Sequence, residues 1–256
     1  MYRVATDLAG VRYLRFDTLG STNAEALTRA RAGERGPLWI VAAAQTAGRG
    51  RRGAAWVSAP GNLYATLLLT EPSPPAAAPQ LSFVAGLALH DAVAGAAPQL
   101  GPSLKLKWPN DLLVGGAKVA GILIEGESDP AFAVAIGIGV NCAHHPDGTA
   151  WPATDLAAAE ALVTPEALLA ALAAAMARRL AQWGEGSGFA SIRADWLKRA
   201  AGLGGDIRVR LPEREFSGRF EGLDEAGRLL VTEGGALTTV GAGEVFGFAP
   251  IKEETR

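Results

Sequence analysis

The chain has little cysteine and no excess of either charge sign. Its 256 residues include a single cysteine, Cys142, and three histidines. One cysteine cannot form an internal disulfide, and no His or Cys residues surround it at the spacing of a zinc site. We therefore expect neither a disulfide scaffold nor a zinc centre, and we expect a cytoplasmic location.

Charge and hydrophobic length exclude two further classes of protein. The 24 basic and 26 acidic residues give a formal net charge of −2. Such a chain does not coat nucleic acid or an acidic membrane through its overall field, so a positive site has to be local. The longest apolar tract, 167–177, is shorter than the roughly 20 residues that span a bilayer, and the N-terminus lacks the pattern of a signal peptide. No membrane segment is expected.

What the sequence does contain is a folded chain of helices and strands. Hydrophobic residues make up 49% and charged residues 20% of it, which suits one or two globular domains. Thr22, followed by Glu25, predicts a capping box at a helix start. Periodicity and turn residues predict a strand at 11–20, a helix at 22–32, strands at 38–45 and 62–70, a helix at 80–97, a strand ending near 108, a hairpin turning at 115–116, a strand at 132–141, and helices at 164–183 and 191–200.

A different pattern begins after the glycine-rich break at 202–205. Short strands separated by turn residues are predicted at 206–211, 215–223, 228–234, 236–240 and 243–248, which is typical of a small β-barrel. The sequence therefore predicts two domains, 1–203 and 204–256.

The loop between the second and third predicted strands carries an unusual cationic motif, "QTAGRGRRG", at residues 45–53. Glycines let backbone N–H groups approach an anion closely. The planar guanidinium group of an arginine can donate two parallel hydrogen bonds to one phosphate or carboxylate. No G-x-x-x-x-G-K-[ST] motif occurs, so an ordinary Walker fold is not indicated. A solvated surface loop and a local nucleic-acid patch remain the alternatives.

A second motif, "KWPND", occupies residues 107–111, and Lys118 follows it across the glycine turn. The predicted hairpin returns Lys118 beside Asn110 and Asp111, where a lysine can stabilise a phosphoryl group. The alternative is that Pro109 and Asn110 form a turn and that Lys118 is an exposed strand residue.

Two weaker signals lie elsewhere in the chain. In "GIGVN", residues 137–141, two glycines on one strand face permit the close approach of something flat, although strand glycines also mark bulges. In "STN", residues 21–23, small donors stand at a helix start, where capping alone would explain them.

Taken in order, "STN", "QTAGRGRRG…W", "KWPNDLL…K…GIL.E" and "GIGVN", followed by a small β domain, resemble the biotin protein ligases. The match runs from about Phe16 to Phe248, and the order and spacing make it specific. The resemblance implies a mixed-sheet α/β catalytic domain of the biotin/lipoate ligase type with an SH3-like C-terminal β-barrel. It also implies a two-step reaction in which biotin and ATP form biotinyl-5′-AMP, and biotin then passes to a lysine of the biotin carboxyl carrier protein of acetyl-CoA carboxylase or a related carboxylase.

The resemblance also implies roles for individual residues. Lys118, Arg51 and Asp111 are the expected catalytic residues, with Asp111 orienting or deprotonating the incoming lysine. Mg²⁺ is expected with ATP, but the sequence does not identify its ligands. Expected biotin-binding residues are Ser21, Thr22, Asn23, Gln45, Gly48, Arg49, Gly50, Arg51 and Lys118; expected nucleotide-binding residues are Arg51, Arg52, Trp56, Asn110 and Asn141.

The sequence departs from the family pattern at two places. Many relatives carry another arginine where this chain has Ala54, which bears on loop closure or adenylate retention. Only about 20 residues precede "STN", too few for the winged-helix DNA-binding domain of ligases that also repress transcription. We therefore expect a monofunctional enzyme without operator binding, and we leave a homodimer open.

Two rival functions remain at this stage. A lipoate or octanoate protein ligase or transferase shares the broad fold and an activating lysine. A non-enzymatic nucleic-acid-binding module would use the basic loop and the terminal barrel. The ligase interpretation further predicts that the segment 48–55 is mobile without ligand and ordered with it.

Overall fold

The computed structural model describes residues 2–129 and 131–248. Within these residues, one sheet contains eight strands in the order β1-β2-β3-β4-β8-β7-β6-β5. Only β2 and β3 are parallel neighbours, so the sheet is mixed. Its strands are β1 (Tyr2–Leu8), β2 (Val11–Leu19), β3 (Leu38–Gln45), β4 (Leu63–Thr70), β5 (Leu104–Lys107), β6 (Asp111–Val114), β7 (Ala117–Glu127) and β8 (Ala133–Val140).

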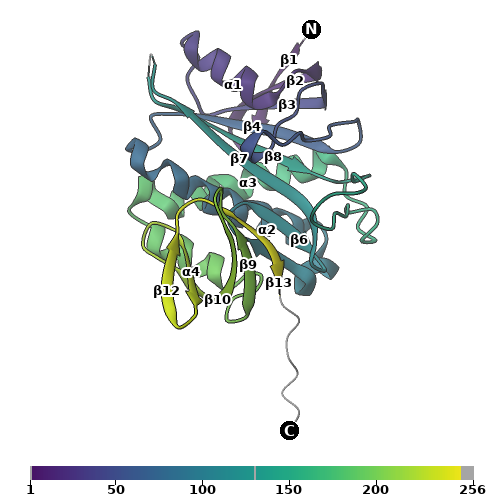
Figure 1. The fold of residues 1–256 in the computed structure, drawn as a ribbon. Coiled ribbons are helices and arrows are strands. Elements are labelled where there is room, and N and C mark those ends of the chain that lie inside the picture. The colour runs from purple at the N-terminus through teal and green to yellow at the C-terminus, as the bar shows by residue number, and fades with distance from the viewer. Residues whose placement is uncertain (1, 130, 249–256) are drawn as a thin grey trace.

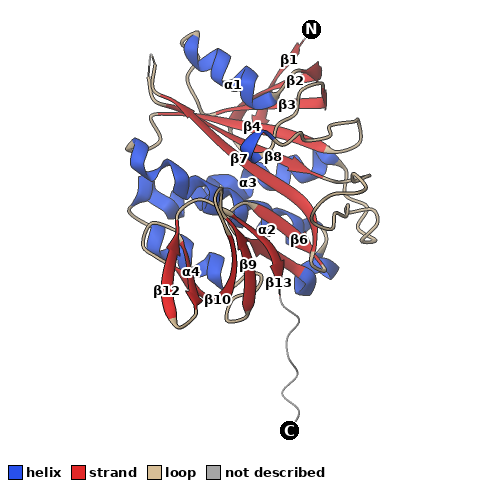
Figure 2. Cartoon of the chain, viewed as in Figure 1, coloured by secondary structure: helices blue, strands red, loops and turns tan. Residues whose placement is uncertain are grey.

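Helices cover both faces of this sheet (Figure 1, Figure 2). The helix α1 (Thr22–Arg31) packs on one face, where Ala26 and Leu27 join a core with Ile40 of β3. The helices α2 (Leu81–Ala96), α3 (Pro165–Trp183) and α4 (Phe189–Leu197) lie on the other face. Because β3, β4 and β8 are buried on both sides, they read as nearly continuous apolar runs.

Three local predictions need correction. The N-cap of α1 is Ser21, whose hydroxyl accepts from the backbone N–H of Ala24 at 3.5 Å, so the capping box predicted at Thr22 is wrong. Glu25 instead forms an ion pair with Arg29 one turn further on, at 2.8 Å. The edge strand β1 was not predicted, and α4 begins two residues before the predicted helix start. Short 3-10 turns add η1 (Arg51–Gly53), η2 (Pro75–Gln80), η3 (Pro98–Ser103) and η4 (Gly184–Gly186).

The predicted hairpin turn at Gly115–Gly116 is confirmed. Both glycines have positive φ, 57° and 85°, which side-chain-bearing residues rarely adopt. The turn lets β7 run back antiparallel to β6, with Asp111 at the start of β6 paired with Gly121 of β7. It therefore places the segment around Lys118 beside the "KWPND" motif.

The C-terminal part forms a second, antiparallel sheet in the order β12-β11-β10-β9-β13. Its strands are β9 (Asp206–Arg210), β10 (Glu215–Leu223), β11 (Leu229–Glu233), β12 (Ala236–Val240) and β13 (Glu244–Phe248), which confirms the predicted strands and the SH3-like architecture. It joins the first part through polar contacts as well as packing: the indole N–H of Trp108 donates to the carbonyl of Gly227 at 3.2 Å. Over the described part of the chain, no helix is both long and apolar enough to cross a bilayer.

Candidate functional site

A cavity of about 860 Å³ opens on the α1 side of the large sheet. This is at the upper end of the usual range for small-molecule sites, roughly 300–1,000 Å³. The cationic loop, the start of α1, β7 and β8 surround it, and Arg210 and Glu244 of the C-terminal sheet reach its rim. The predicted site residues that line it are Ser21, Thr22, Asn23, Gln45, Arg49, Gly50, Arg51, Arg52, Trp56, Asn110, Asp111, Lys118 and Asn141.

Gly48 is the exception among the predicted residues, since it stands behind the cavity wall. Its carbonyl accepts from the backbone N–H of Trp56 at 2.9 Å, which ties the two arms of the loop together. Its contribution is to loop shape rather than to the cavity surface.

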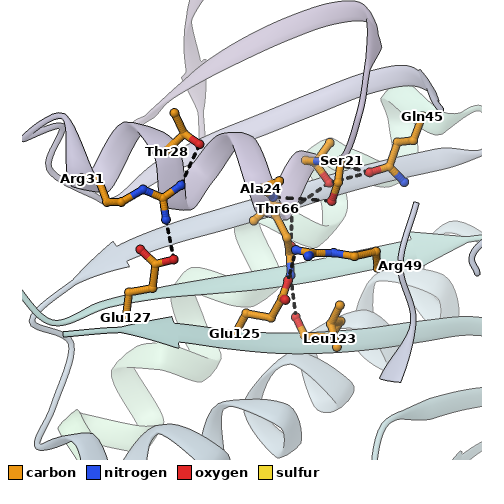
Figure 3. Close-up of polar contacts among 12 residues, drawn as sticks. Ser21, Ala24, Thr28, Arg31, Gln45, Arg49, Thr66, Leu123, Glu125 and Glu127 are labelled. Carbon is orange, nitrogen blue, oxygen red and sulfur yellow. Dashed lines mark hydrogen bonds and ion pairs between the residues drawn. The ribbon is translucent and has the colours of Figure 1, made fainter. Parts of the chain in front are cut away.

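One wall of the cavity consists of hydroxyl and amide groups from α1 and β3, and Thr66 of β4 lies buried behind them (Figure 3). Gln45 Oε1 accepts from the backbone N–H of Thr22 at 2.8 Å. Thr66 Oγ1 lies 2.8 Å from Thr22 Oγ1 and donates to Asn23 Oδ1 at 2.7 Å. Apart from Gln45, these side chains are buried. They form a preorganised set of polar groups at one end of the cavity, which we call the amide wall (Thr22, Asn23, Gln45 and Thr66).

The floor beside the amide wall is made of strand glycines. The indole of Trp56 lies against Gly139, where an added Cβ would be 2.6 Å from Trp56 Nε1. Gly121, opposite Gly139 in the ladder, also borders the indole. The predicted close approach of a flat group to the "GIGVN" strand is therefore confirmed, and in this structure the flat group is Trp56. Its Nε1 is buried without a hydrogen-bond partner.

The other end of the cavity is cationic. Asp111, which is 6% exposed, lies 2.7 Å from Lys118 Nζ through one oxygen and 2.9 Å from Lys107 Nζ through the other. Burial by itself would raise the pKa of Asp111. The positive charges of Lys118 and, to a lesser extent, Lys107 have the larger combined effect and hold this pKa below its usual range. The predicted approach of Lys118 to Asp111 is confirmed, and Asp111 is a carboxylate at neutral pH.

Lys107 is the first residue of the "KWPND" motif, but the sequence indicated no role for it. Its side chain is 2% exposed, donates to the carbonyl of Val245 at 3.2 Å, and lies 4.0 Å from the ring centroid of Trp151. A buried lysine requires such partners, because an unpaired buried charge is costly. The signal available in the sequence was a lysine next to buried Leu106 and Trp108.

Arg51 connects the loop to the rest of the site. Its guanidinium lies 3.5 Å from Asn110 Oδ1 and donates to the carbonyl of Gly243 at 3.2 Å. Burial lowers the pKa of Arg51, and the negative charges of Asp111 and Glu244 partly offset that effect. A partly desolvated arginine near a lysine is a strong binding site for a second, negatively charged group.

The remaining loop arginines differ from each other. Arg49 donates to Glu125 of β7 at 3.0 Å, whereas Arg52 is exposed and has a left-handed backbone with φ of 56°. Arg49 and Arg51 are thus turned toward partners around the cavity.

Sequence reasoning missed the segment after β8. Cavity-lining residues of this segment are Pro146, Asp147, Thr149, Ala150, Trp151 and Ala153. Trp151 is anchored by donation of its indole N–H to the carbonyl of Gly116 at 3.0 Å, and Asn141 donates to the carbonyl of Thr154 at 3.0 Å. Irregular segments carry no periodic signal, and a Trp between two prolines was the only hint.

Cys142 and the histidines play no direct part in the cavity. Cys142 is 3% exposed, and burial raises the pKa of its thiol to about 11, so it packs as a small core residue, as predicted. His90 lies on α2 as expected, and His145 forms a 2.5 Å pair with Asp155.

Across residues 2–129 and 131–248, no group of three metal-ligating side chains was found. Because both oxygens of Asp111 face lysines, the buried carboxylate does not fit a Mg²⁺ ligand, and we assign no step to a protein-held metal.

The fold and cavity define a class: an α/β ligase-type domain with an SH3-like appendage and a site for an anionic ligand. Comparisons with known proteins agree. Residues 18–141 match the model of the Biotin/lipoate A/B protein ligase family, and residues 202–246 match the Biotin protein ligase C terminal domain. The chain belongs to the biotin protein ligase family.

Individual relatives cover most of the chain. It is 46% identical over 234 residues to a biotin--[acetyl-CoA-carboxylase] ligase of Paracoccus denitrificans, spanning 88% of this chain and 96% of the relative. It is 34% identical over 236 residues to the corresponding ligase of Mycobacterium tuberculosis, spanning 88% of this chain and 85% of the relative. Among solved structures, biotin protein ligase from Aquifex aeolicus in complex with biotin and ATP superposes with a TM-score of 0.75 at 26% identity, covering 93% and 97% of the two chains.

Proposed function

We propose that this chain is an ATP-dependent biotin protein ligase that makes biotinyl-5′-AMP and transfers biotin to a lysine of the biotin carboxyl carrier protein of acetyl-CoA carboxylase. One observation carries the proposal. Arg51 and Lys118 stand at one end of a cavity whose other end is the neutral amide wall. Such a cavity suits a ligand with a polar uncharged head and an anionic tail, which describes biotin.

In the first step, a carboxylate oxygen of biotin attacks the α-phosphorus of ATP, the bond to the β-phosphate oxygen breaks, and pyrophosphate leaves. Two anions have to meet, so fixed cations help more than a protein nucleophile. Lys118 and Arg51 are the proposed cations. Lys118 would give up its ion pair with Asp111 and bind the incoming oxygens of the substrates instead. Mg²⁺, carried by the triphosphate, would offset the remaining charge.

In the second step, the acceptor lysine amine attacks the acyl carbon, AMP leaves, and the amine loses a proton. Asp111 is the proposed carboxylate beside this amine. Because its pKa is held below the usual range, it is a weak base, which favours orientation of the ammonium group over proton removal. Lys107 remains paired with Asp111 while Lys118 is engaged.

The proposed assignment of the other residues follows their place in the cavity. The amide wall, with Ser21, would hold the ureido head of biotin. Arg49, Gly50 and Arg51 would contact the carboxylate or its adenylate, and Gly48 would shape the loop. Arg52, Trp56, Asn110 and Asn141 would border the nucleotide. The domain division at 203/204, a homodimer, the absence of operator binding and a cytoplasmic location remain predictions.

The deciding assay supplies ATP, a carboxyl carrier domain, and either biotin or lipoate. We expect biotin-dependent pyrophosphate release and biotin attached to a single carrier lysine. Transfer of lipoate in preference to biotin would replace the substrate proposal, since the matched family includes lipoate ligases. Salt-sensitive nucleic-acid binding with no pyrophosphate release would reject the enzyme proposal.

A further inference from the structure

Glu125 belongs to the "GIL.E" motif, yet no role has been given to it. It lies near the end of β7, two residues beyond Leu123, and its side chain is 28% exposed. Figure 3 shows it between α1 and the cationic loop. A single oxygen, Oε2, accepts from Asn23 Nδ2 at 2.8 Å and from Arg49 at 3.0 Å. One atom thus joins the amide wall to the loop.

Hydrogen-bond chemistry shows what this contact fixes. A carboxylate only accepts, so the NH₂ end of Asn23 has to face Glu125 and its Oδ1 has to face Thr66. Asn23 is 3% exposed and Thr66 is fully buried, so neither has water as an alternative partner. Asn23 Nδ2 also donates to the carbonyl of Leu123 at 3.3 Å, so Glu125 holds the amide orientation together with that carbonyl and supports, through Thr66, the hydroxyl chain that reaches Thr22.

The same oxygen also anchors the loop. Arg49 lines both the main cavity and a second hollow of about 210 Å³ that residues of α1 and β7 also line. Glu125 borders only the second hollow. It does not touch the main cavity and acts through Arg49 and Asn23.

We propose that Glu125 is the positioning residue that couples closure of the cationic loop to the orientation of the amide wall. This rests on the proposed function, because it assumes that the amide wall and Arg49 bind biotin. Without the carboxylate, Arg49 loses its anchor on β7, and Asn23 keeps only the longer contact with the carbonyl of Leu123. Both changes weaken ligand retention without altering Lys118 or Arg51, the proposed cations of the activation step.

The test compares Glu125→Ala with a matched control, Glu127→Ala. Glu127 lies two residues further along the same strand and pairs with Arg31 at 2.5 Å, which in turn contacts Thr28 of α1 rather than the loop. For Glu125→Ala we expect biotin Kd and the dissociation rate of biotinyl-5′-AMP to rise on the order of tenfold or more. Pyrophosphate release at saturating biotin and ATP should fall much less. Glu127→Ala should leave all three values near those of the wild type.

Two additional variants separate positioning from structural support. Glu125→Gln keeps an acceptor for Asn23 and should restore most of the biotin affinity while adenylate still dissociates faster, because Arg49 loses its counter-charge. In a double-mutant cycle, Arg49→Ala should add less to Glu125→Ala than it costs alone. Equal losses of melting temperature in Glu125→Ala and Glu127→Ala with unchanged biotin Kd would overturn the proposal. A wild-type protein that neither binds biotin nor releases pyrophosphate would instead refute the proposed function.

Discussion

Trp56 lies against Gly139 so closely that a methyl group on Gly139 would come within 2.6 Å of the indole nitrogen. The indole covers the glycine floor between the amide wall and Lys118, which is 5.3 Å from its ring centroid. In the proposed function, this floor is where the ligand lies. We therefore expect Trp56 to leave this floor when biotin binds.

Displacement of Trp56 should be visible by fluorescence. The buried Nε1 of Trp56 has no hydrogen-bond partner, and burying an unpaired donor costs about 1–3 kcal/mol of free energy. This cost favours movement of the indole away from the glycine floor. We expect biotin to change intrinsic tryptophan emission in the wild type and to leave it nearly unchanged in Trp56→Phe. An equal change in both proteins would show that Trp56 stays in place.

Lys118→Ala should abolish activation while preserving the fold. The lysine is 27% exposed, and Asp111 keeps Lys107 as a partner, so the expected loss in free energy of unfolding is about 1 kcal/mol or less. Adenylate formation should fall on the order of 10²–10³-fold, measured as pyrophosphate release. Lys105→Ala, an exposed change on β5, is the control. Normal adenylate synthesis in Lys118→Ala would refute the role.

Arg51→Ala should act mainly on retention of the adenylate. The variant removes a cation of the site together with its contact to the carbonyl of Gly243, which holds the C-terminal sheet against the cavity. We expect biotinyl-5′-AMP to dissociate at least tenfold faster, and Arg51→Lys to be intermediate, because lysine keeps the charge but lacks the planar fork. Stopped-flow dissociation measures this, and unchanged dissociation would contradict our account of the loop.

The buried ion pair predicts a pH dependence of stability. The pKa of Asp111 is lower in the folded protein, so its contribution is fully present above the unfolded value of about 3.9 and is lost as pH falls below that. Asp111→Asn leaves Lys107 buried without a counter-ion and should cost about 3–5 kcal/mol at pH 7. Denaturant unfolding should show this difference shrinking below about pH 4. A difference that stays constant to pH 2 would show that Asp111 is not ionised in the fold.

Cys142 provides a simple test of the core. Burial raises the pKa of its thiol to about 11, so the reactive thiolate is scarce at neutral pH. Iodoacetamide should modify the native protein far more slowly than the urea-unfolded protein at pH 8. Comparable rates would place Cys142 at the surface.

Most of the fold could be predicted because its signals are local. The apolar strands β3, β4 and β8 and the glycine turn of the β6–β7 hairpin follow from residues close in sequence. The N-cap was misplaced by one residue, because Ser21 and Thr22 both carry capping hydroxyls, and only the contact of Thr22 with Gln45 at the end of β3 distinguishes them. The strand β1 carries charged residues at the sheet edge and gave a weak pattern.

The site was only partly predictable, because several of its contacts join segments that are distant in sequence. The motifs indicated Lys118, Asp111 and the cationic loop, and the hairpin brings the first two together. The pairing of Lys107 with Val245 and of Arg51 with Gly243 depends on how the two sheets dock. No short-range pattern carries such information, and the same holds for the contact of Glu125 with Arg49.

The central claim is that a cationic loop and a hairpin lysine converge on one acyl phosphate. A crystal structure of the protein with bound biotinyl-5′-AMP tests it most directly. We predict Arg51 and Lys118 within hydrogen-bonding distance of the phosphate, with Trp56 moved from the glycine floor. Both side chains directed into solvent, away from the vitamin and the nucleotide, would contradict the account.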